Sequence, residues 1–219
     1  MSGSEVQRTP NPRGEGERLR QDLLEAAVRL VDADSPRALT LRGVARGAGV
    51  SAPSVYRHFA SLPDLMAEVT GRCFEELIED ICTARDSTVD VEDRLLFSAR
   101  AYLRYAERFP GRYALLFGRG STHAGPADTP FYDPTGVSDK AFAVLVDAVA
   151  ACLSVSHASA DHATVVATAI WVGLDGFANL RVQRPHFPWP DPDTMLHHLV
   201  LDHVQSPTPA INAPASARR

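Results

Sequence analysis

The sequence contains few cysteines. Cys73, Cys82 and Cys152 lie far apart along the 219 residues, and none forms a CxxC pair. An odd number of widely spaced cysteines argues against a disulfide framework and is typical of reduced thiols in a cytoplasmic protein. No apolar run reaches the roughly 18–20 residues of a membrane span, and the polar start of the chain lacks the apolar segment of a secretory signal. We therefore expect a cytoplasmic protein with no membrane partner.

Sequence motifs of enzyme active sites are also missing. The chain has no Gly-rich phosphate loop, no nucleophile elbow and no spaced pair of carboxylates in an apolar frame. Its C-terminal histidines show neither HExxH nor another spacing that sets two metal ligands on one helical face. These histidines are His157, His162, His197, His198 and His203. We predict a protein that is not an enzyme and that holds no cofactor and no metal.

Charge is distributed unevenly along the chain. The net charge is −5, yet residues 1–62 hold 9 arginines and no lysine against 7 acidic residues. The remainder holds 13 of the 22 basic residues and 20 of the 27 acidic ones. The N-terminal part is therefore mildly basic and the rest acidic. This asymmetry permits a DNA-binding N-terminus without requiring one.

Apolar residues at helical spacing predict an all-α fold. Leu19, Leu23 and Ala27 mark an amphipathic helix over roughly 18–33, which Pro36 cannot continue. Further helices are predicted at roughly 91–108, 110–118, 138–154, 160–183 and 193–204. We find no convincing strand and no internal repeat.

A segment near the N-terminus has the pattern of a helix-turn-helix. Thr40 is placed to cap a short helix, and Gly49 follows that helix where a left-handed residue is favoured. Ser51 is predicted to cap a third helix that ends at Phe59, and Ser61 to cap a fourth. Two short helices joined in this way place the second one in the major groove of DNA.

The third helix gives most of its surface to polar groups and aromatic rings. Val55 and Phe59 are expected to anchor it, which leaves its other side chains for DNA. Arg57 is predicted to bond guanine or phosphate. Tyr56 and His58 either donate to phosphate or pack between helices. The predicted DNA-binding residues are Thr40, Arg42, Ser51, Ala52, Pro53, Ser54, Tyr56, Arg57 and His58.

The stretch LTLRGVARGAGVSAPSVYRHFASLPDLM resembles the DNA-binding segment of TetR-family transcriptional regulators. The resemblance covers roughly 18–66. It depends on Thr40, Val44, Ala45, Ala48, Gly49, Val50, Ser51, Tyr56, His58, Phe59 and Leu65. The family usually opens the fourth helix with a lysine that bonds a phosphate, whereas this chain has Leu62 followed by Pro63. Backbone groups or the N-terminal arm could supply that contact; Arg8 and Arg13 of the arm either enter a minor groove or are solvated charges.

The resemblance implies a homodimer on double-stranded DNA. The predicted helix at 160–183 is apolar almost all round, so it would pack on its own domain and on a partner, forming a four-helix bundle with the last helix. The predicted interface residues are Val166, Ile170, Phe177, Leu196, Leu199 and Val200. A two-fold dimer presents two recognition helices about 34–36 Å apart, which matches a palindromic operator.

Two C-terminal segments resemble a subgroup of these regulators that is named for a Trp-His-Gly motif. They are FPGRYALLFG (109–118) and WVGLDGF (171–177), in which Asp175 stands at the histidine position. The resemblance implies a small-molecule pocket, with Asp175 as a polar group for a cationic or hydroxylated effector. The predicted lining residues are Tyr113, Leu116, Phe117, Trp171 and Asp175. The same residues could instead form plain core, with Asp175 facing solvent.

The sequence thus predicts four regions. They are a disordered N-terminal arm (1–17), a helix-turn-helix DNA-binding domain (18–62), a helical effector-binding and dimerisation domain (63–205) and a disordered tail (206–219), with a Gly/Pro-rich loop at 119–137. The predicted function is a dimeric repressor that an unknown small molecule releases from its operator. A constitutive DNA-binding protein without a ligand, or an all-α enzyme, are the alternatives.

Overall fold

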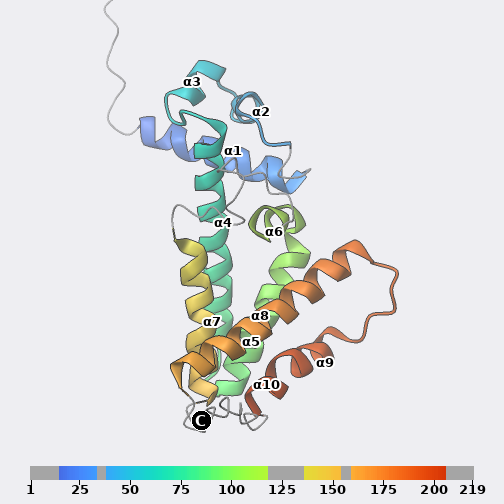
Figure 1. Cartoon of the computed structure of the whole chain (residues 1–219). Coiled ribbons are helices and arrows are strands. Elements are labelled where there is room, and N and C mark those ends of the chain that lie inside the picture. Colours follow the sequence, from blue (N-terminus) through green and yellow to red (C-terminus); the bar gives the residue numbers. More distant parts are fainter. Residues whose placement is uncertain (1–14, 34–37, 118–135, 154–158, 206–219) are drawn as a thin grey trace, which may run out of the picture. The chain divides into compact units, whose positions relative to one another are not determined.

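The structure is a computed structural model, and it describes residues 15–33, 38–117, 136–153 and 159–205. Every regular element in these ranges is a helix, which confirms the predicted all-α class (Figure 1). Arg8, Arg13, the C-terminal tail and nearly all of the Gly/Pro-rich loop lie outside the described residues.

The chain divides into two compact units. Unit 1 combines Met1–Ile78 with Tyr105–Ala141, and unit 2 combines Glu79–Arg104 with Phe142–Arg219. The division therefore falls within α4 (Leu62–Arg85) and within α5 (Val91–Arg108).

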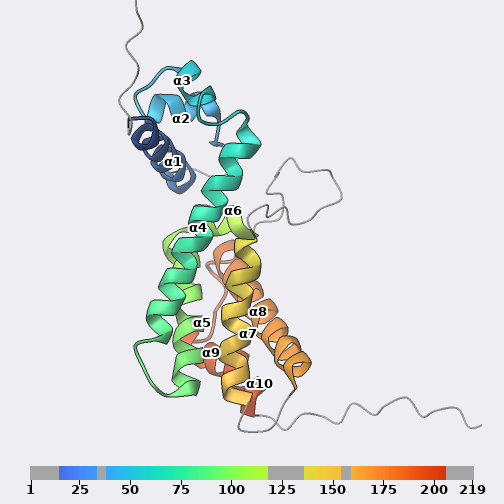
Figure 2. The ribbon, with the colours of Figure 1, turned by 90° about the vertical axis from the view of Figure 1, so that its left-hand side faces the viewer.

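Unit 1 contains the N-terminal helices, the whole of α6 and the first part of α4. The elements besides α4 are α1 (Glu15–Ala33), α2 (Leu41–Gly47), α3 (Ala52–Tyr56) and α6 (Pro110–Phe117). Figure 2 shows α1, α2 and α3 grouped around the start of α4. Their shared core buries Leu23, Val31, Val44, Val55, Phe59 and Leu65. Helix α1 begins three residues before the predicted start, inside the region expected to be a disordered arm.

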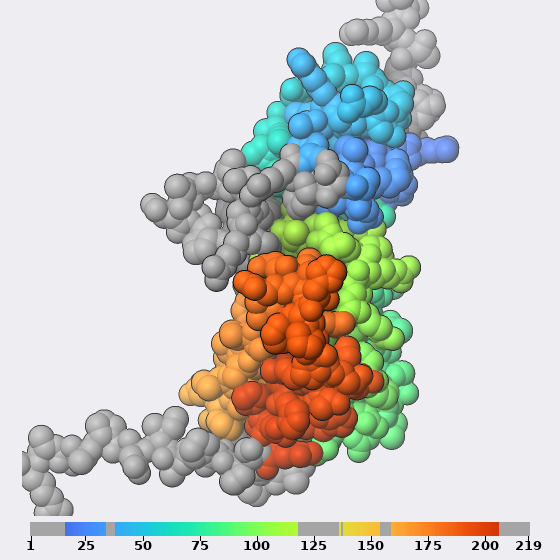
Figure 3. All heavy atoms as spheres, turned by 90° about the vertical axis from the view of Figure 1, so that its right-hand side faces the viewer, coloured from blue at the N-terminus to red at the C-terminus, as the bar shows by residue number. Residues whose placement is uncertain are grey.

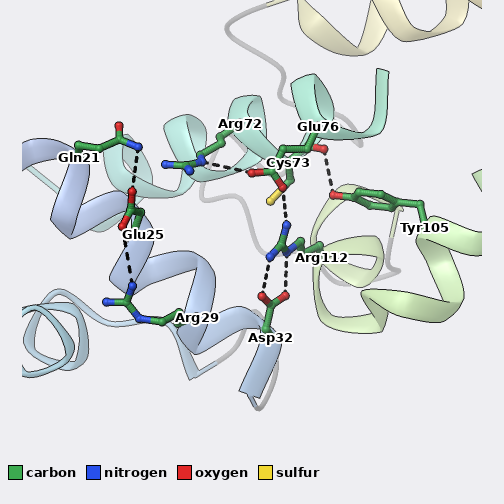
Figure 4. A network of polar contacts seen from close by, with 9 residues as sticks. All are labelled: Gln21, Glu25, Arg29, Asp32, Arg72, Cys73, Glu76, Tyr105 and Arg112. Carbon is green, nitrogen blue, oxygen red and sulfur yellow. Dashed lines mark hydrogen bonds and ion pairs between the residues drawn. The ribbon is translucent and has the colours of Figure 1, made fainter. Parts of the chain in front are cut away.

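A cluster of ion pairs around Arg112 joins α6 to α1 and α4 (Figure 4). The guanidinium of Arg112 donates to both carboxylate oxygens of Asp32, from Nε at 2.8 Å and from Nη2 at 2.7 Å. Its Nη1 donates to Glu76 of α4, and its carbon Cζ lies 4.1 Å from the ring centroid of Phe109. Only 13% of the Arg112 side chain is exposed. The hydrogen bonds to Asp32 raise the pKa of Arg112, so the cation is held firmly between its two carboxylates.

The start of α6 also approaches the backbone of α1 very closely. A Cβ atom at Gly111 would lie 2.1 Å from the carbonyl oxygen of Val31, which no ordinary contact allows. Glycine is therefore required at this position because its missing side chain leaves room for the end of α1. The Gly111 contact and the Arg112 ion pairs together fix α6 to the N-terminal helices.

Unit 2 is built from the last part of α4, the first part of α5 and the C-terminal helices. The remaining elements are α7 (Val137–Leu153), α8 (Ala160–Gln183), α9 (Pro192–Leu196), a π-helical segment η3 (His197–Leu201) and α10 (Asp202–Gln205). Polar contacts link α5 to its neighbours: Arg100 Nε donates to Asp193 of α9 at 2.9 Å, and the Cys152 thiol of α7 donates to the Val91 carbonyl at 3.2 Å. The helix predicted over 193–204 is interrupted because the Asp202 N–H bonds the His197 carbonyl, one residue beyond the α-helical partner.

By length and composition alone, one helix of the described ranges, Ala160–Gln183, is apolar enough to cross a membrane. The core helix of a folded domain meets the same criterion, and α8 buries Ala167, Ile170 and Leu174 inside unit 2. Other apolar residues of the same helix, Val165, Val172, Leu180 and Val182, are exposed.

All three cysteines are free thiols. Burial raises the pKa of Cys73 to about 12 and that of Cys152 to about 11. Both thiols therefore stay protonated near neutral pH. Because the thiolate is the reactive form, neither thiol is activated as a nucleophile.

We expect Gly111→Ala to destabilise unit 1. The added methyl group must displace the end of α1 or the start of α6, and overpacking of this kind costs roughly 1–3 kcal/mol or more. Urea unfolding followed by circular dichroism measures the change. Gly16→Ala is the matched control because it adds the same methyl group to α1 with nothing within 4 Å, and it should stay within about 0.5 kcal/mol of the parent. An unchanged midpoint for Gly111→Ala would contradict the close approach.

Candidate nucleic-acid interface

Helix α2 begins at a capping threonine. The exposed Thr40 accepts a hydrogen bond at Oγ1 from the backbone N–H of Gly43, at 3.0 Å. This bond satisfies one of the free donors at the helix start. The hydroxyl proton of Thr40 is not used by the cap, and it can be donated to an acceptor outside the helix, such as a phosphate oxygen. Arg42 lies exposed in the first turn of the same helix.

The turn between α2 and α3 depends on Gly49. Its φ is +68°, a left-handed conformation that side chains disfavour. The Gly49 N–H donates to the Arg46 carbonyl at 3.2 Å, and the Val50 N–H donates to the Ala45 carbonyl at 2.9 Å. These two bonds form a Schellman motif, which ends α2 and turns the chain into α3. The turn is the one that the AGVS sequence predicts.

Helix α3 is anchored by its apolar residues and open on its polar side. Val55 and Phe59 are buried, as expected, while Tyr56 exposes 57% of its surface and Arg57 is also exposed. Tyr56 therefore does not pack between helices, whereas His58 is half-buried. The helix ends at Tyr56 and not at Phe59, because the chain turns at residues 57–60 and carries the Phe59 ring into the core.

The ring of Phe59 is covered by Arg20 of α1. The guanidinium carbon of Arg20 lies 4.8 Å from the ring centroid, and Arg20 also forms an ion pair with Glu68 of α4. This arrangement joins the end of the α3 segment to both neighbouring helices, so α3 is held by more than its own five residues.

A chain of hydrogen bonds runs along the open side of α3. The hydroxyl oxygens of Ser51 and Ser54 are 2.9 Å apart, and Arg57 Nη2 donates to Ser54 Oγ at 3.1 Å. Ser51 occupies the predicted N-cap position, but its side chain makes no capping bond and contacts Ser54 instead. Of the other predicted DNA-binding residues on α3, Pro53 is exposed and Ala52 is half-buried.

The start of α4 has Leu62 where the family usually has a lysine, and it carries a negative charge at Asp64. Ser61 Oγ donates to the Asp64 carboxylate at 2.8 Å and accepts from the Asp64 N–H at 3.3 Å, which gives the cap predicted at Ser61. Leu62 is half-buried, and Pro63 and Asp64 are exposed. No cation therefore lies in the first turn of this helix.

The predicted effector-binding residues lie in two different units. Tyr113, Leu116 and Phe117 belong to α6 in unit 1, where the first two are buried and the Phe117 ring stands edge-on to Phe74 at 5.6 Å. In unit 2, the half-buried Trp171 has its ring 5.8 Å from that of Phe142. A pocket lined by both groups of residues stays a prediction.

The Asp175 carboxylate has hydrogen-bond partners within unit 2. Its Oδ1 accepts a hydrogen bond from Asn179 Nδ2 at 3.0 Å and from the buried Tyr102 hydroxyl of α5 at 3.5 Å. The sequence pattern indicates Asp175 but neither of these two partners. Asn179 lies four residues away on the same helix, so the spacing could have revealed it, whereas Tyr102 lies 73 residues earlier in the chain.

The predicted dimer-interface residues pack inside their own unit. Val166, Ile170, Phe177, Leu196 and Val200 are buried, and Leu199 is half-buried beside Gly173. The exposed large apolar residues of α8 lie elsewhere on the helix; they are Val165, Val172, Leu180 and Val182. Because the helix is apolar on nearly every side, its composition could not tell which side faces inward. Figure 3 shows α8 and the segment that follows it at the surface of unit 2.

Among the described residues, no group of three or more His, Cys, Asp or Glu side chains could hold a metal ion. His157 lies outside those residues. His198 Nδ1 lies 2.9 Å from the Asp202 carboxylate, one turn further along the same helical segment.

Two family models match the chain. The model for bacterial regulatory proteins of the tetR family matches residues 23–69, and a tetracyclin repressor-like C-terminal domain matches residues 95–203. The second match includes both segments that carry the C-terminal resemblance.

Curated relatives are also regulators of this kind. The HTH-type transcriptional regulator Rv1816 of Mycobacterium tuberculosis is 32% identical over 117 residues, which are 52% of this chain and 48% of the relative. An uncharacterized HTH-type transcriptional regulator of the same organism, Rv0681, is 29% identical over 163 residues, covering 74% of this chain and 70% of the relative. The chain thus spans about half the length of the first curated relatives that it matches.

Solved structures share the fold. A tetR-family transcriptional regulator from Streptomyces coelicolor superposes with a TM-score of 0.66 at 21% identity, over 85% of this chain and 79% of that one. The regulator FadR from Bacillus subtilis, solved in complex with stearoyl-CoA, gives 0.65 at 10% identity, over 84% and 97%. At these identities the comparison shows the fold alone.

The fold, the helix-turn-helix and the two family matches agree on one class, the bacterial regulatory proteins that the first model describes. The chain belongs to the TetR family.

We expect Leu62→Lys to strengthen DNA binding at low salt. A lysine at this position would add the phosphate contact that the family usually makes, so the salt dependence of binding should steepen by about one counterion. Fluorescence anisotropy with a labelled duplex at several salt concentrations measures both quantities. Leu62→Gln, which removes the apolar side chain without adding charge, is the control. An unchanged salt slope for Leu62→Lys would mean that the start of α4 does not reach a phosphate.

Proposed function

We propose that the protein is a dimeric repressor that leaves a palindromic operator when a small-molecule effector binds. The observation that carries the proposal is the open side of α3, which the Gly49 turn presents with its polar groups outward and its apolar residues buried. A DNA-binding regulator of this kind acts in the cytoplasm.

In the proposed complex, α3 lies in the major groove. Arg57 faces a base edge with Ser54 beside it, while Ala52 and Pro53 offer apolar contacts to a thymine methyl group. Contacts to the phosphate backbone come from the residues around them: Thr40, Arg42, Ser51, Tyr56 and His58. These contacts fix the position of the helix-turn-helix domain, here called the head (α1 to α3), on the duplex. The base contacts supply sequence preference.

The exposed apolar residues of α8 support a dimer of two copies of the chain. Val165, Val172 and Leu180 are spaced by seven and eight residues, so they lie on one side of the helix, and each is well exposed. An exposed apolar stripe of this length is typical of a helix that packs on a partner. A two-fold pair would set two recognition helices about 34–36 Å apart, as a palindromic operator requires.

The contacts of α6 suggest how an effector could act on the head. Because Gly111 and Arg112 tie α6 to the end of α1, a ligand that displaces Tyr113 or Leu116 would also displace the N-terminal helices. A coupling free energy of about 1–3 kcal/mol between effector and operator is typical of such systems. If no compound releases the operator, the alternative of a constitutive regulator applies.

Selection of bound sequences from random duplex DNA tests the proposal directly. Purified protein at a stated salt concentration should enrich one palindrome, and that palindrome then serves as the probe in a screen for compounds that release it. Weak binding without sequence preference would contradict the proposal.

Replacement of Arg57 by alanine should weaken binding to the selected palindrome by about 1–3 kcal/mol, if the Arg57 guanidinium forms a bidentate contact with a guanine. Fluorescence anisotropy against the parent protein measures the loss. Arg104→Ala, at an exposed arginine of unit 2, is the control and should leave the affinity unchanged. Equal affinity of Arg57→Ala and the parent would remove Arg57 from the interface.

The double substitution Val165→Asp and Val172→Asp should separate the dimer. Both side chains are exposed in the single chain, at 65% and 63%, so the change places charge at the interface without disturbing the core. Light scattering after size exclusion should give a mass near 23.7 kDa in place of twice that value. Val89→Asp, at a residue that is 96% exposed, is the control. A double variant that stays dimeric would assign the interface to another surface.

A further inference from the structure

The hydrogen-bonded chain on α3 gives Arg57 an unusual environment. Its guanidinium donates to the neutral hydroxyl of Ser54, and among the residues that the structure describes no carboxylate forms an ion pair with it. Three other arginines of unit 1 are paired with carboxylates: Arg20 with Glu68, Arg72 with Glu76, and Arg112 with Asp32. The Ser54 contact therefore directs the Arg57 side chain without neutralising its charge.

The direction of the bonds favours this role. Arg57 can only donate, so Ser54 Oγ accepts from it, and the Ser51 and Ser54 hydroxyls, 2.9 Å apart, form a second bond in which either one can donate. In the arrangement in which Ser54 donates to Ser51, the Ser54 oxygen becomes a better acceptor for Arg57, because hydrogen bonds in a chain polarise one another. The bond to Ser54 also uses one of the five N–H donors of Arg57, which leaves enough donors for a bidentate contact with guanine O6 and N7.

An exposed arginine without such a bond samples many rotamers and must lose them when it binds. The bond to Ser54 restricts these rotamers in advance and orients the planar guanidinium of Arg57. Discrimination between guanine and adenine depends on that orientation. A bond of this kind matters little to folding, since all three side chains lie at the surface. Its effect should appear in base preference.

We propose that Ser54 is a positioning residue that aligns Arg57 to recognise one guanine in each half-site. The proposal rests on the proposed function, because it requires that α3 enters the major groove. It assigns base recognition to Arg57, orientation to Ser54, and support of the Ser54 hydroxyl to Ser51.

The test is selection from random duplexes with four proteins: the parent, Ser54→Ala, Ser54→Thr and Arg57→Ala. The parent should prefer guanine at one position of the half-site by about tenfold or more, as a bidentate contact provides. Ser54→Ala should reduce that preference to about threefold or less at the same position that Arg57→Ala affects, with other positions unchanged. Ser54→Thr keeps the hydroxyl and should restore the preference.

Salt titration by fluorescence anisotropy separates orientation from a direct backbone contact. Ser54→Ala keeps every charge, so its salt slope should equal that of the parent, whereas Arg42→Ala should reduce the slope by about one if Arg42 bonds a phosphate. Thermal unfolding of Ser54→Ala should match the parent, which excludes a folding defect as the cause.

Three outcomes would overturn the proposal. Uniform weakening by Ser54→Ala across all sequences would make Ser54 a backbone contact. Loss of preference at a different position from Arg57→Ala would mean that Ser54 contacts a base itself, and unchanged preference would show that Arg57 needs no support. Absence of any selected sequence with the parent protein is a different result, since it contradicts the proposed function on which the inference rests.

Discussion

The close approach of α6 to α1 is the constraint on which the arrangement of unit 1 depends. A carbonyl oxygen of α1 occupies the space that a side chain at Gly111 would need, and Arg112 beside it is held by carboxylates from α1 and α4. Because backbone contact and ion pairs act at the same place, α6 cannot slide along α1 without losing both. The short helix is thus part of the same compact unit as the helix-turn-helix, although about fifty residues separate it from Phe59 in the sequence.

In the helix-turn-helix, the residues that hold α3 in place differ from the residues that are exposed for a partner. Gly49 sets the turn, and Val55 and Phe59 hold α3 in the core, so none of the polar residues of α3 is needed for folding. A helix of five residues has little stability of its own. Its position therefore depends on these buried anchors and on Arg20 above Phe59, and its outer side is available for a partner.

The sequence predicted this part well because its signals are local. A cap at Thr40, a left-handed glycine and a short apolar repeat each act within a few residues, and together they predict the helices and the turn. Packing between distant segments left no such signal. The inward side of α8, the Tyr102 contact to Asp175 and the division of α4 between two units all depend on residues far apart in the chain. The spacing of the sequence could have predicted the contacts among Ser51, Ser54 and Arg57. These residues recur every three positions, which places them on one side of a helix turn.

The charge of the head bears on how a regulator of this kind finds its operator. Nonspecific affinity for DNA comes from cations that contact phosphates, and this head is only mildly basic. Leu62 stands at the position where the family usually has a lysine, and the acidic Asp64 follows two residues later. A head with few phosphate contacts binds random DNA weakly. Under the proposed function, the operator must then be distinguished by a small number of base contacts and by the pairing of two heads. The orientation of Arg57 consequently contributes more to recognition here than it would in a strongly basic head.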